Sequence, residues 1–136
     1  MSLPENLVLT ILPSRLAISR LSAKEPVPPW AQQGSFSAIV RTDRELSLVC
    51  DEALVSEDIT TERGWRALRI EGVLSFSMVG VLAAIAVPLA GGGISIFAVS
   101  TYDTDYILVK ETLLPRATEI LIQSGFKVLK DVRLSA

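Results

Sequence analysis

Short apolar blocks separated by polar turns run along the whole chain and predict a protein with many strands and few helices. Seven segments have the alternating or continuously apolar pattern that is typical of strands. They are residues 16–21, 36–40, 46–50, 65–71, 94–102, 106–109 and 126–134. Residues 7–12 are also apolar and end at Pro13.

Two segments have helical periodicity instead. In residues 77–90, the large apolar side chains recur at helical spacing, Ser75 or Ser77 can cap the start, and the glycines at 91–93 end the helix. In residues 113–124, Thr112 is the expected N-cap and Gly125 the C-terminal stop.

The first of these helices is apolar on its second face as well. That face carries small side chains, namely Val79, Gly80, Ala83, Val87 and Ala90. A helix that is apolar all round is typically buried on both sides. We therefore expect this face to meet the first half of the chain or a second subunit, and we predict a homodimer.

The segments 94–102 and 106–109 form a predicted hairpin. Asp103, Thr104 and Asp105 connect them, and aspartate tolerates turn conformations. The hairpin therefore carries two carboxylates at its tip. They are either solvated turn residues or part of a binding site.

A weak repeat links the two halves of the sequence at an offset of 60 positions. Asp43 then matches Asp103, and Leu48 matches Leu108. In both halves, the pattern predicts a strand, an acidic turn and a second strand. The first half has too few residues between 22 and 34, with prolines at 26, 28 and 29, for a full helix there. The prediction is an α+β fold of two ferredoxin-like βαββαβ modules in tandem, residues 1–62 with reduced helices and residues 63–136.

Composition narrows the class of protein. The 136 residues carry a net charge of -2 and only 13 Lys and Arg, which gives no electrostatic footprint for nucleic acid. Cys50 is the single cysteine, so no intrachain disulfide can form and a cytoplasmic location is expected. Residues 72–102 lack charge, but Pro88 and the glycines at 91–93 leave no run long enough to span a membrane. No signal peptide is evident.

Catalytic chemistry is poorly supported. The sequence has no histidine, which removes Ser-His-Asp triads and histidine metal sites. The glycine triplet follows a helix, the reverse of a dinucleotide fingerprint. Adjacent turn carboxylates outside an apolar pocket are poor acid–base groups, whereas a deeply buried acid in a cleft would favour a small enzyme. We expect no catalytic residue, metal or cofactor.

Binding is better supported. The turn at 72–77 leads into the start of a helix, where free backbone N–H groups and the helix dipole favour a carboxylate. The hairpin tip offers the hydroxyls of Ser100 and Thr101 and the carboxylates of Asp103 and Asp105, which suit an ammonium group. A free amino acid carries both charges.

Residues 65–127 resemble an ACT domain, the small ferredoxin-like module that binds amino acids and regulates metabolism. The resemblance rests on segments 71–80 and 96–109, which are similar to those of bacterial tandem ACT proteins and animal cytosolic arginine sensors. It implies a ligand at an interface between ACT modules. The implied residues are Gly72, Ser75, Phe76, Ser77, Ser100, Thr101 and Asp105; Asp103 is added because of its charge.

Two functions remain open. The first is an amino-acid-binding regulatory or sensor module without catalytic activity, acting on a regulated enzyme or partner protein. The second is a ligand-free interaction module that assembles through its ACT faces. A defined pocket with ordered polar groups favours the first, and a filled turn with a flat apolar face favours the second.

Overall fold

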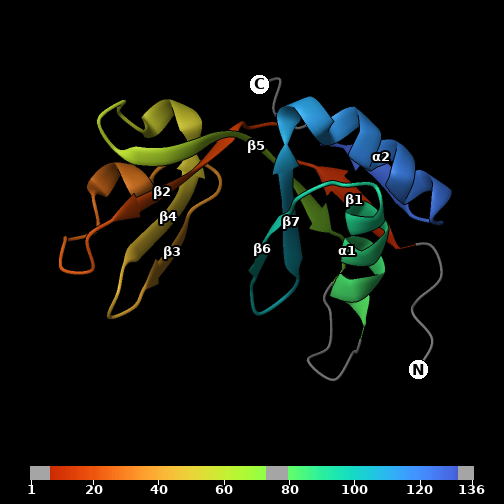
Figure 1. Cartoon of the computed structure of the whole chain (residues 1–136), viewed down its shortest axis with the longest axis horizontal. Helices are drawn as coiled ribbons and strands as arrows, with labels where there is room; N and C mark the ends of the chain where they lie inside the picture. The colour runs from red at the N-terminus through yellow and green to blue at the C-terminus, as the bar shows by residue number, and fades with distance from the viewer. Residues whose placement is uncertain (1–6, 73–79, 132–136) are drawn as a thin grey trace. The chain divides into compact units, whose positions relative to one another are not determined.

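The computed structural model describes residues 7–72 and 80–131 and shows an α+β protein (Figure 1). The chain divides into two compact units. Residues 14–65 form one, called here the N-terminal unit, and residues 1–13 with 66–136 form the other, called the C-terminal unit.

The N-terminal unit is a sheet with almost no helix. Its strands are β2 (Leu16–Leu21), β3 (Ala38–Arg41), β4 (Leu46–Asp51) and the first part of β5 (Thr60–Ile70). They lie in the order β3-β4-β2-β5, and each strand is antiparallel to its neighbour. The 3₁₀ turns η1 (Pro29–Gln32) and η2 (Glu52–Leu54) stand where a ferredoxin-like unit has helices. The predicted module with reduced helices is confirmed.

The C-terminal unit has the complete set of elements. After β5 come α1 (Val81–Gly91), β6 (Phe97–Ser100), β7 (Asp105–Lys110), η3 (Glu111–Leu113), α2 (Leu114–Gln123) and β8 (Lys127–Lys130). β7 lies between β5 and β6. The predicted order of strand, helix, hairpin, helix and strand is confirmed.

One further strand enters this sheet from the start of the chain. β1 (Val8–Ile11) lies between β5 and β8, antiparallel to β5 and parallel to β8. This segment belongs to the compact C-terminal unit. The division of the chain into modules at 62/63 remains a prediction.

The core of the C-terminal unit lies between its two helices and its sheet. α1 contributes Val81, Ile85 and Leu89, and α2 contributes Ala117 and Leu121, all buried. They share one cluster with buried side chains of β1, β5 and β7, and the two helices contact each other. The apolar periodicity of both helices therefore marks the face that packs on the core.

Both helices end in the same glycine motif. At the end of α1, the N–H of Gly93 donates to Ala90 (3.0 Å) and that of Ile94 to Leu89 (2.9 Å), with φ of +76° at Gly93. At the end of α2, Gly125 has φ of +99° and the N–H of Phe126 donates to Leu121 (3.0 Å). This is the Schellman motif. Its left-handed position is usually glycine, because glycine has no Cβ that would strain this conformation. The predicted glycine stops are confirmed.

Several predicted boundaries were wrong. α1 begins at Val81, not residue 77, because Gly80 precedes it with φ of +87°, a left-handed conformation that cannot be helical. β6 covers only Phe97–Ser100. It starts later than predicted because the Ile94 N–H is bonded to the Leu89 carbonyl at the end of α1. β5 begins at Thr60, five residues before the predicted start at 65, because it pairs with β2 there.

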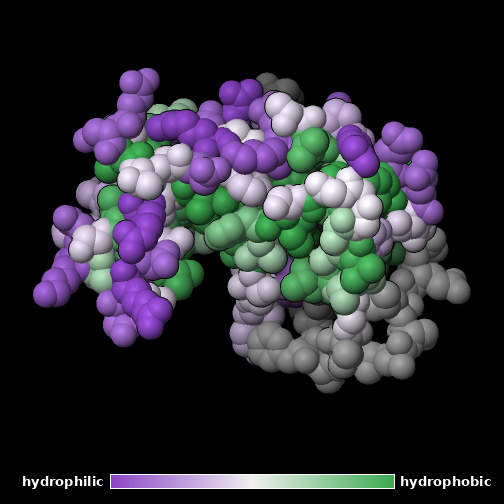
Figure 2. Space-filling model, viewed as in Figure 1, coloured by the Kyte–Doolittle hydropathy of each residue, from purple (hydrophilic) through white to green (hydrophobic). Residues whose placement is uncertain are grey.

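The second face of α1 is exposed and carries no charge. Ala83 and Ala90 are exposed, and the side chain of Val87 is 68% exposed. Figure 2 shows the surface over α1 in green and pale shades, whereas the tip of the β3–β4 hairpin is purple. No helix in the described part of the chain is long and apolar enough to cross a membrane.

Candidate functional site

The predicted hairpin site lies at the tip of β6 and β7 in the C-terminal unit. Thr101 closes the turn. Its N–H donates to the Thr104 carbonyl (2.8 Å), its hydroxyl donates to the same oxygen (3.0 Å), and it accepts from the Thr104 N–H (3.2 Å). The Thr101 hydroxyl is thus used to shape the turn, a common role for threonine in such turns.

Thr104 fastens this turn to the neighbouring strand. Its buried hydroxyl donates to the carbonyl of Ile70, the last residue of β5, at 2.8 Å. Gly72 follows two residues later, exposed and with φ of +87°. One unit therefore brings the hairpin tip beside the strand end that leads into the predicted ligand turn. Ser75, Phe76 and Ser77 lie outside the described residues.

The remaining predicted side chains face solvent to different degrees. Ser100 and Asp103 are exposed, whereas Asp105 is partly buried and pairs with Ser100 across the hairpin. Sequence reasoning missed Thr104, which it treated as a plain connecting residue. No local signal marks this role, because the carbonyl that the Thr104 hydroxyl reaches lies 34 residues away in the sequence.

The N-terminal unit repeats the hairpin turn. The Thr42 N–H donates to the Glu45 carbonyl (2.9 Å), and the Thr42 hydroxyl accepts from the Glu45 N–H (3.1 Å). These contacts match those between Thr101 and Thr104. The two hairpins are therefore built on one plan.

This equivalence corrects the predicted offset of the repeat. Ala38 pairs with Val49 at the start of the first hairpin, and Phe97 pairs with Leu108 at the start of the second. The offset between the hairpins is thus 59, and the predicted 60 was wrong by one residue. A slip of one residue in a strand exchanges its two faces, so equivalent positions change character.

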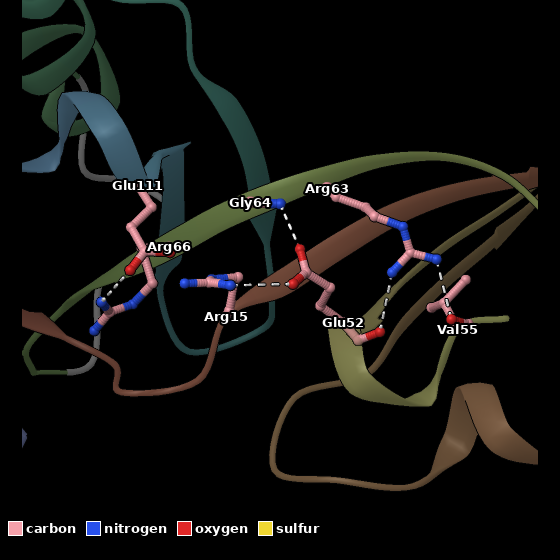
Figure 3. Close-up of polar contacts among 7 residues, drawn as sticks. All are labelled: Arg15, Glu52, Val55, Arg63, Gly64, Arg66 and Glu111. Atoms are coloured by element: carbon pink, nitrogen blue, oxygen red, sulfur yellow. Dashed lines mark hydrogen bonds and ion pairs between the residues drawn. The ribbon is translucent and has the colours of Figure 1, made fainter. Parts of the chain in front are cut away.

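A second duplicated feature is an arginine–glutamate ion pair in each unit (Figure 3). Arg15 lies 3.5 Å from Glu52 in the N-terminal unit, and Arg66 lies 3.9 Å from Glu111 in the C-terminal unit. Each arginine precedes a buried strand segment, and each glutamate opens the 3₁₀ turn after the third strand. The sequence prediction missed these pairs, although both arginines directly precede two apolar residues.

Glu52 does more than pair with Arg15. Its carboxylate accepts the N–H of Gly64 at 2.6 Å (Figure 3), and Gly64 has φ of +80°. The pairing of β2 with β5 shifts register beside this position. The left-handed glycine makes a bulge in β5 that the glutamate stabilises.

A hollow of about 590 Å³ lies in the N-terminal unit beside Glu52. Its lining mixes charges of both signs: Ser14, Arg15, Asp51, Glu52, Ala53, Val55, Glu57 and Arg63. Arg63 is held there by the carbonyls of Val55 (3.0 Å) and Ser56 (3.3 Å). Among the described residues, no three His, Cys, Asp or Glu side chains gather closely enough to hold a metal ion.

Asp51 is the acid at the edge of this hollow whose environment is unusual. Burial raises the pKa of its carboxyl, and a hydrogen bond from the Ser35 backbone opposes that rise. Its Oδ1 atom is buried without a hydrogen-bond partner. A Cβ on Gly34 would lie 2.5 Å from the other carboxylate oxygen, so the loop after η1 must carry glycine here.

Comparison with known families gives matches over both units. The model of the ACT domain matches residues 60–123, and a second model, of an N-terminal domain, matches residues 14–58.

Two human proteins are similar in sequence. Putative protein CASTOR3P is 36% identical over 104 residues, covering 71% of this chain and 61% of that protein. The cytosolic arginine sensor for mTORC1 subunit 1 is 32% identical over 90 residues, covering 65% of this chain and 26% of the sensor. The chain thus spans less than two thirds of either relative.

Solved structures agree in fold. A protein from Agrobacterium tumefaciens, Atu0741, is 36% identical, with a TM-score of 0.88 over 94% of this chain and 96% of that one. The regulatory subunit of aspartate kinase from Thermus thermophilus, in its ligand-free form, has a TM-score of 0.56 at 11% identity over 82% of this chain and 93% of that one. At that identity the likeness concerns the fold alone.

Replacing Thr104 with valine tests the attachment of the hairpin tip. The variant keeps the shape of the side chain but leaves the Ile70 carbonyl without its hydroxyl donor. We expect the free energy of unfolding, measured in urea, to fall by about 1–3 kcal/mol. Thr60→Val, at an exposed position of β5, is the control and should change it by less than about 0.5 kcal/mol. Equal effects would show that the Thr104 bond does not matter.

Replacing Asp51 with asparagine tests its burial. Because the folded state raises the pKa of Asp51 above its ordinary 3.8, folding favours the protonated form, and stability falls as pH rises through this window. Asp51→Asn should therefore raise the urea midpoint at pH 7, and the gain should shrink towards pH 3. Asp43→Asn, in the exposed turn, is the matched control. A gain of the same size at both pH values would contradict the assignment.

Proposed function

Because this chain belongs to the ACT-domain family, we propose that it is a regulatory module that binds a free amino acid. One observation carries this proposal. Thr104 fastens the hairpin tip with its two carboxylates to Ile70 at the end of β5, two residues before Gly72. The two carboxylates of the tip therefore lie near the strand end from which the chain enters the proposed ligand turn.

The proposed ligand lies at an interface between ACT modules, between the turn at 72–77 of one module and the hairpin tip at 100–105 of a module in a second chain. Its ammonium group meets Asp105, which is partly buried and thus less screened by water than exposed Asp103. Its carboxylate takes backbone N–H groups of the turn, where Gly72, Ser75, Phe76 and Ser77 contribute, and Ser100 and Thr101 border the tip. The ammonium group of the ligand therefore meets a carboxylate, and its carboxylate meets hydrogen-bond donors.

Arginine is the first amino acid to test, because the human relative is named as a cytosolic arginine sensor. The same name supports a cytoplasmic location for this chain. We further propose that the module has no catalytic activity and acts on a separate enzyme or partner protein. The sequence has no histidine, and neither carboxylate at the tip is deeply buried.

A thermal-shift screen against the twenty amino acids tests this function directly. A ligand that binds only the folded state raises the melting temperature, by an amount that grows with its concentration. If no amino acid does so, the alternative of a ligand-free interaction module that assembles through its ACT faces gains instead.

Asp105→Ala should weaken binding of the selected amino acid by one to two orders of magnitude. The lost contact is a hydrogen-bonded charge pair worth about 1.5–3 kcal/mol. Asp103→Ala should weaken it less, because that side chain is exposed. Asp43→Ala, in the equivalent turn of the N-terminal unit, is the control and should leave the dissociation constant from calorimetric titration unchanged. Wild-type affinity in Asp105→Ala would rule out the ammonium contact.

We also propose a homodimer formed through the exposed, uncharged face of α1. Ala83→Glu places a carboxylate in that contact, and burying an unpaired charge there costs several kcal/mol. Sedimentation should show a dimeric wild type and a monomeric variant. Since Ala83 is exposed in the folded chain, the variant should keep the wild-type circular dichroism spectrum. A wild type that stays monomeric at high micromolar concentration would contradict the proposal.

A further inference from the structure

The two hairpins share one backbone plan but differ in the side chains beside their turns. Arg41 stands at the position of Ser100, and Leu46 stands at the position of Asp105. The N-terminal unit therefore lacks the Ser100 hydroxyl and the Asp105 carboxylate that the proposed ligand site uses, whereas Thr42 keeps the position of Thr101. The contacts of Arg41 and Leu46 show which part of the N-terminal unit occupies the position equivalent to the proposed ligand site.

Arg41 holds part of its own unit. Its guanidinium donates to the carbonyl of Ala23 and, at 2.8 Å, to that of Glu25. Both carbonyls belong to the segment 22–34, which connects β2 to β3 and contains only the short turn η1. The arginine thus fastens this segment to the end of β3.

Leu46 anchors the same segment through apolar contact. Its side chain is fully buried, whereas Asp105 at the equivalent position is partly exposed. Leu46 and Leu48 form one buried cluster with Ala31, and Val27 and Trp30 pack against it. A carboxylate could not replace Leu46 under this cover without a large desolvation cost.

Two polar contacts close the far end of the segment. The Ser37 hydroxyl donates to the Ala31 carbonyl at 2.5 Å. Asp51 lies against Gly34, where any Cβ would meet its carboxylate, and accepts the Ser35 N–H. The segment is therefore held at both ends and in its middle.

We infer that the N-terminal unit is a closed copy of the ligand-binding module, in which the segment 22–34 covers the position of the ligand site. Each chain then carries one amino-acid site, and its hairpin residues come from the C-terminal unit. This inference rests on the proposed function, because the compared site is the one proposed there.

Calorimetric titration of the intact wild-type protein tests the number of sites, with arginine as the first probe and then any amino acid that raises the melting temperature. We expect one ligand per chain. Two ligands per chain would overturn the inference and leave the proposed function intact. Absence of binding by every amino acid would instead sink the proposed function, so the two failures are distinguishable.

Hydrogen exchange tests the closed segment without any ligand. The amides of Glu25 and Ala31 are hydrogen-bonded within segment 22–34 and should be protected in the wild type. Arg41→Ala should speed their exchange at least tenfold and leave residues 97–110 unchanged. Arg44→Ala, which removes a neighbouring exposed arginine side chain, is the matched control. Unprotected amides in the wild type, or equal rates in Arg41→Ala, would overturn the inference.

A third measurement avoids substitution altogether. Saturating wild-type protein with the selected amino acid should increase protection in the hairpin 97–110 and leave the hairpin 38–51 unchanged. Added protection in both hairpins would show that the N-terminal unit is open to ligand.

Discussion

The backbone pairing of β5 is the constraint on which the rest of the structure depends. This strand of eleven residues pairs with β2 in the N-terminal unit and with β1 in the C-terminal unit. Each pairing needs an extended backbone that aligns the N–H and C=O groups of β5 with those of its partner strand, so both units require β5 to remain extended. The exception is Gly64, whose left-handed backbone is allowed because Glu52 accepts its N–H. The same glutamate pairs with Arg15 at the start of β2.

The repeated parts are those that shape the backbone, and the divergent parts are the side chains of the proposed ligand site. Both units keep a threonine that closes the hairpin turn and an arginine–glutamate pair beside the third strand. The side chains next to the turns differ between the units. They are Arg41 and Leu46 in the N-terminal unit, and Ser100 and Asp105 in the C-terminal unit. A packed loop excludes water and ligand together, whereas an open tip with carboxylates keeps its charge available.

The match to the ACT domain and the local geometry support different parts of the proposed function. The ACT relationship indicates a regulatory module. The hydrogen bond from Thr104 to Ile70 holds the hairpin tip of the proposed site against the end of β5. The uncharged outer face of α1 supports the proposed homodimer, because exposed apolar surface on a helix tends to be covered by a partner.

The sequence by itself determined the element order, the two helices with their glycine stops, and the acid-bearing hairpin, because these depend on local periodicity and on glycine conformations. Tertiary structure decided what depends on distant partners. The placement of β1 beside β8, the extension of β5 into a polar stretch and the offset of 59 follow from strand pairing, which joins residues far apart in the chain. The role of Thr104 was hidden for the same reason, since its acceptor lies 34 residues away. Local patterns report which face of an element is apolar, but only the folded chain supplies the group that each polar atom meets.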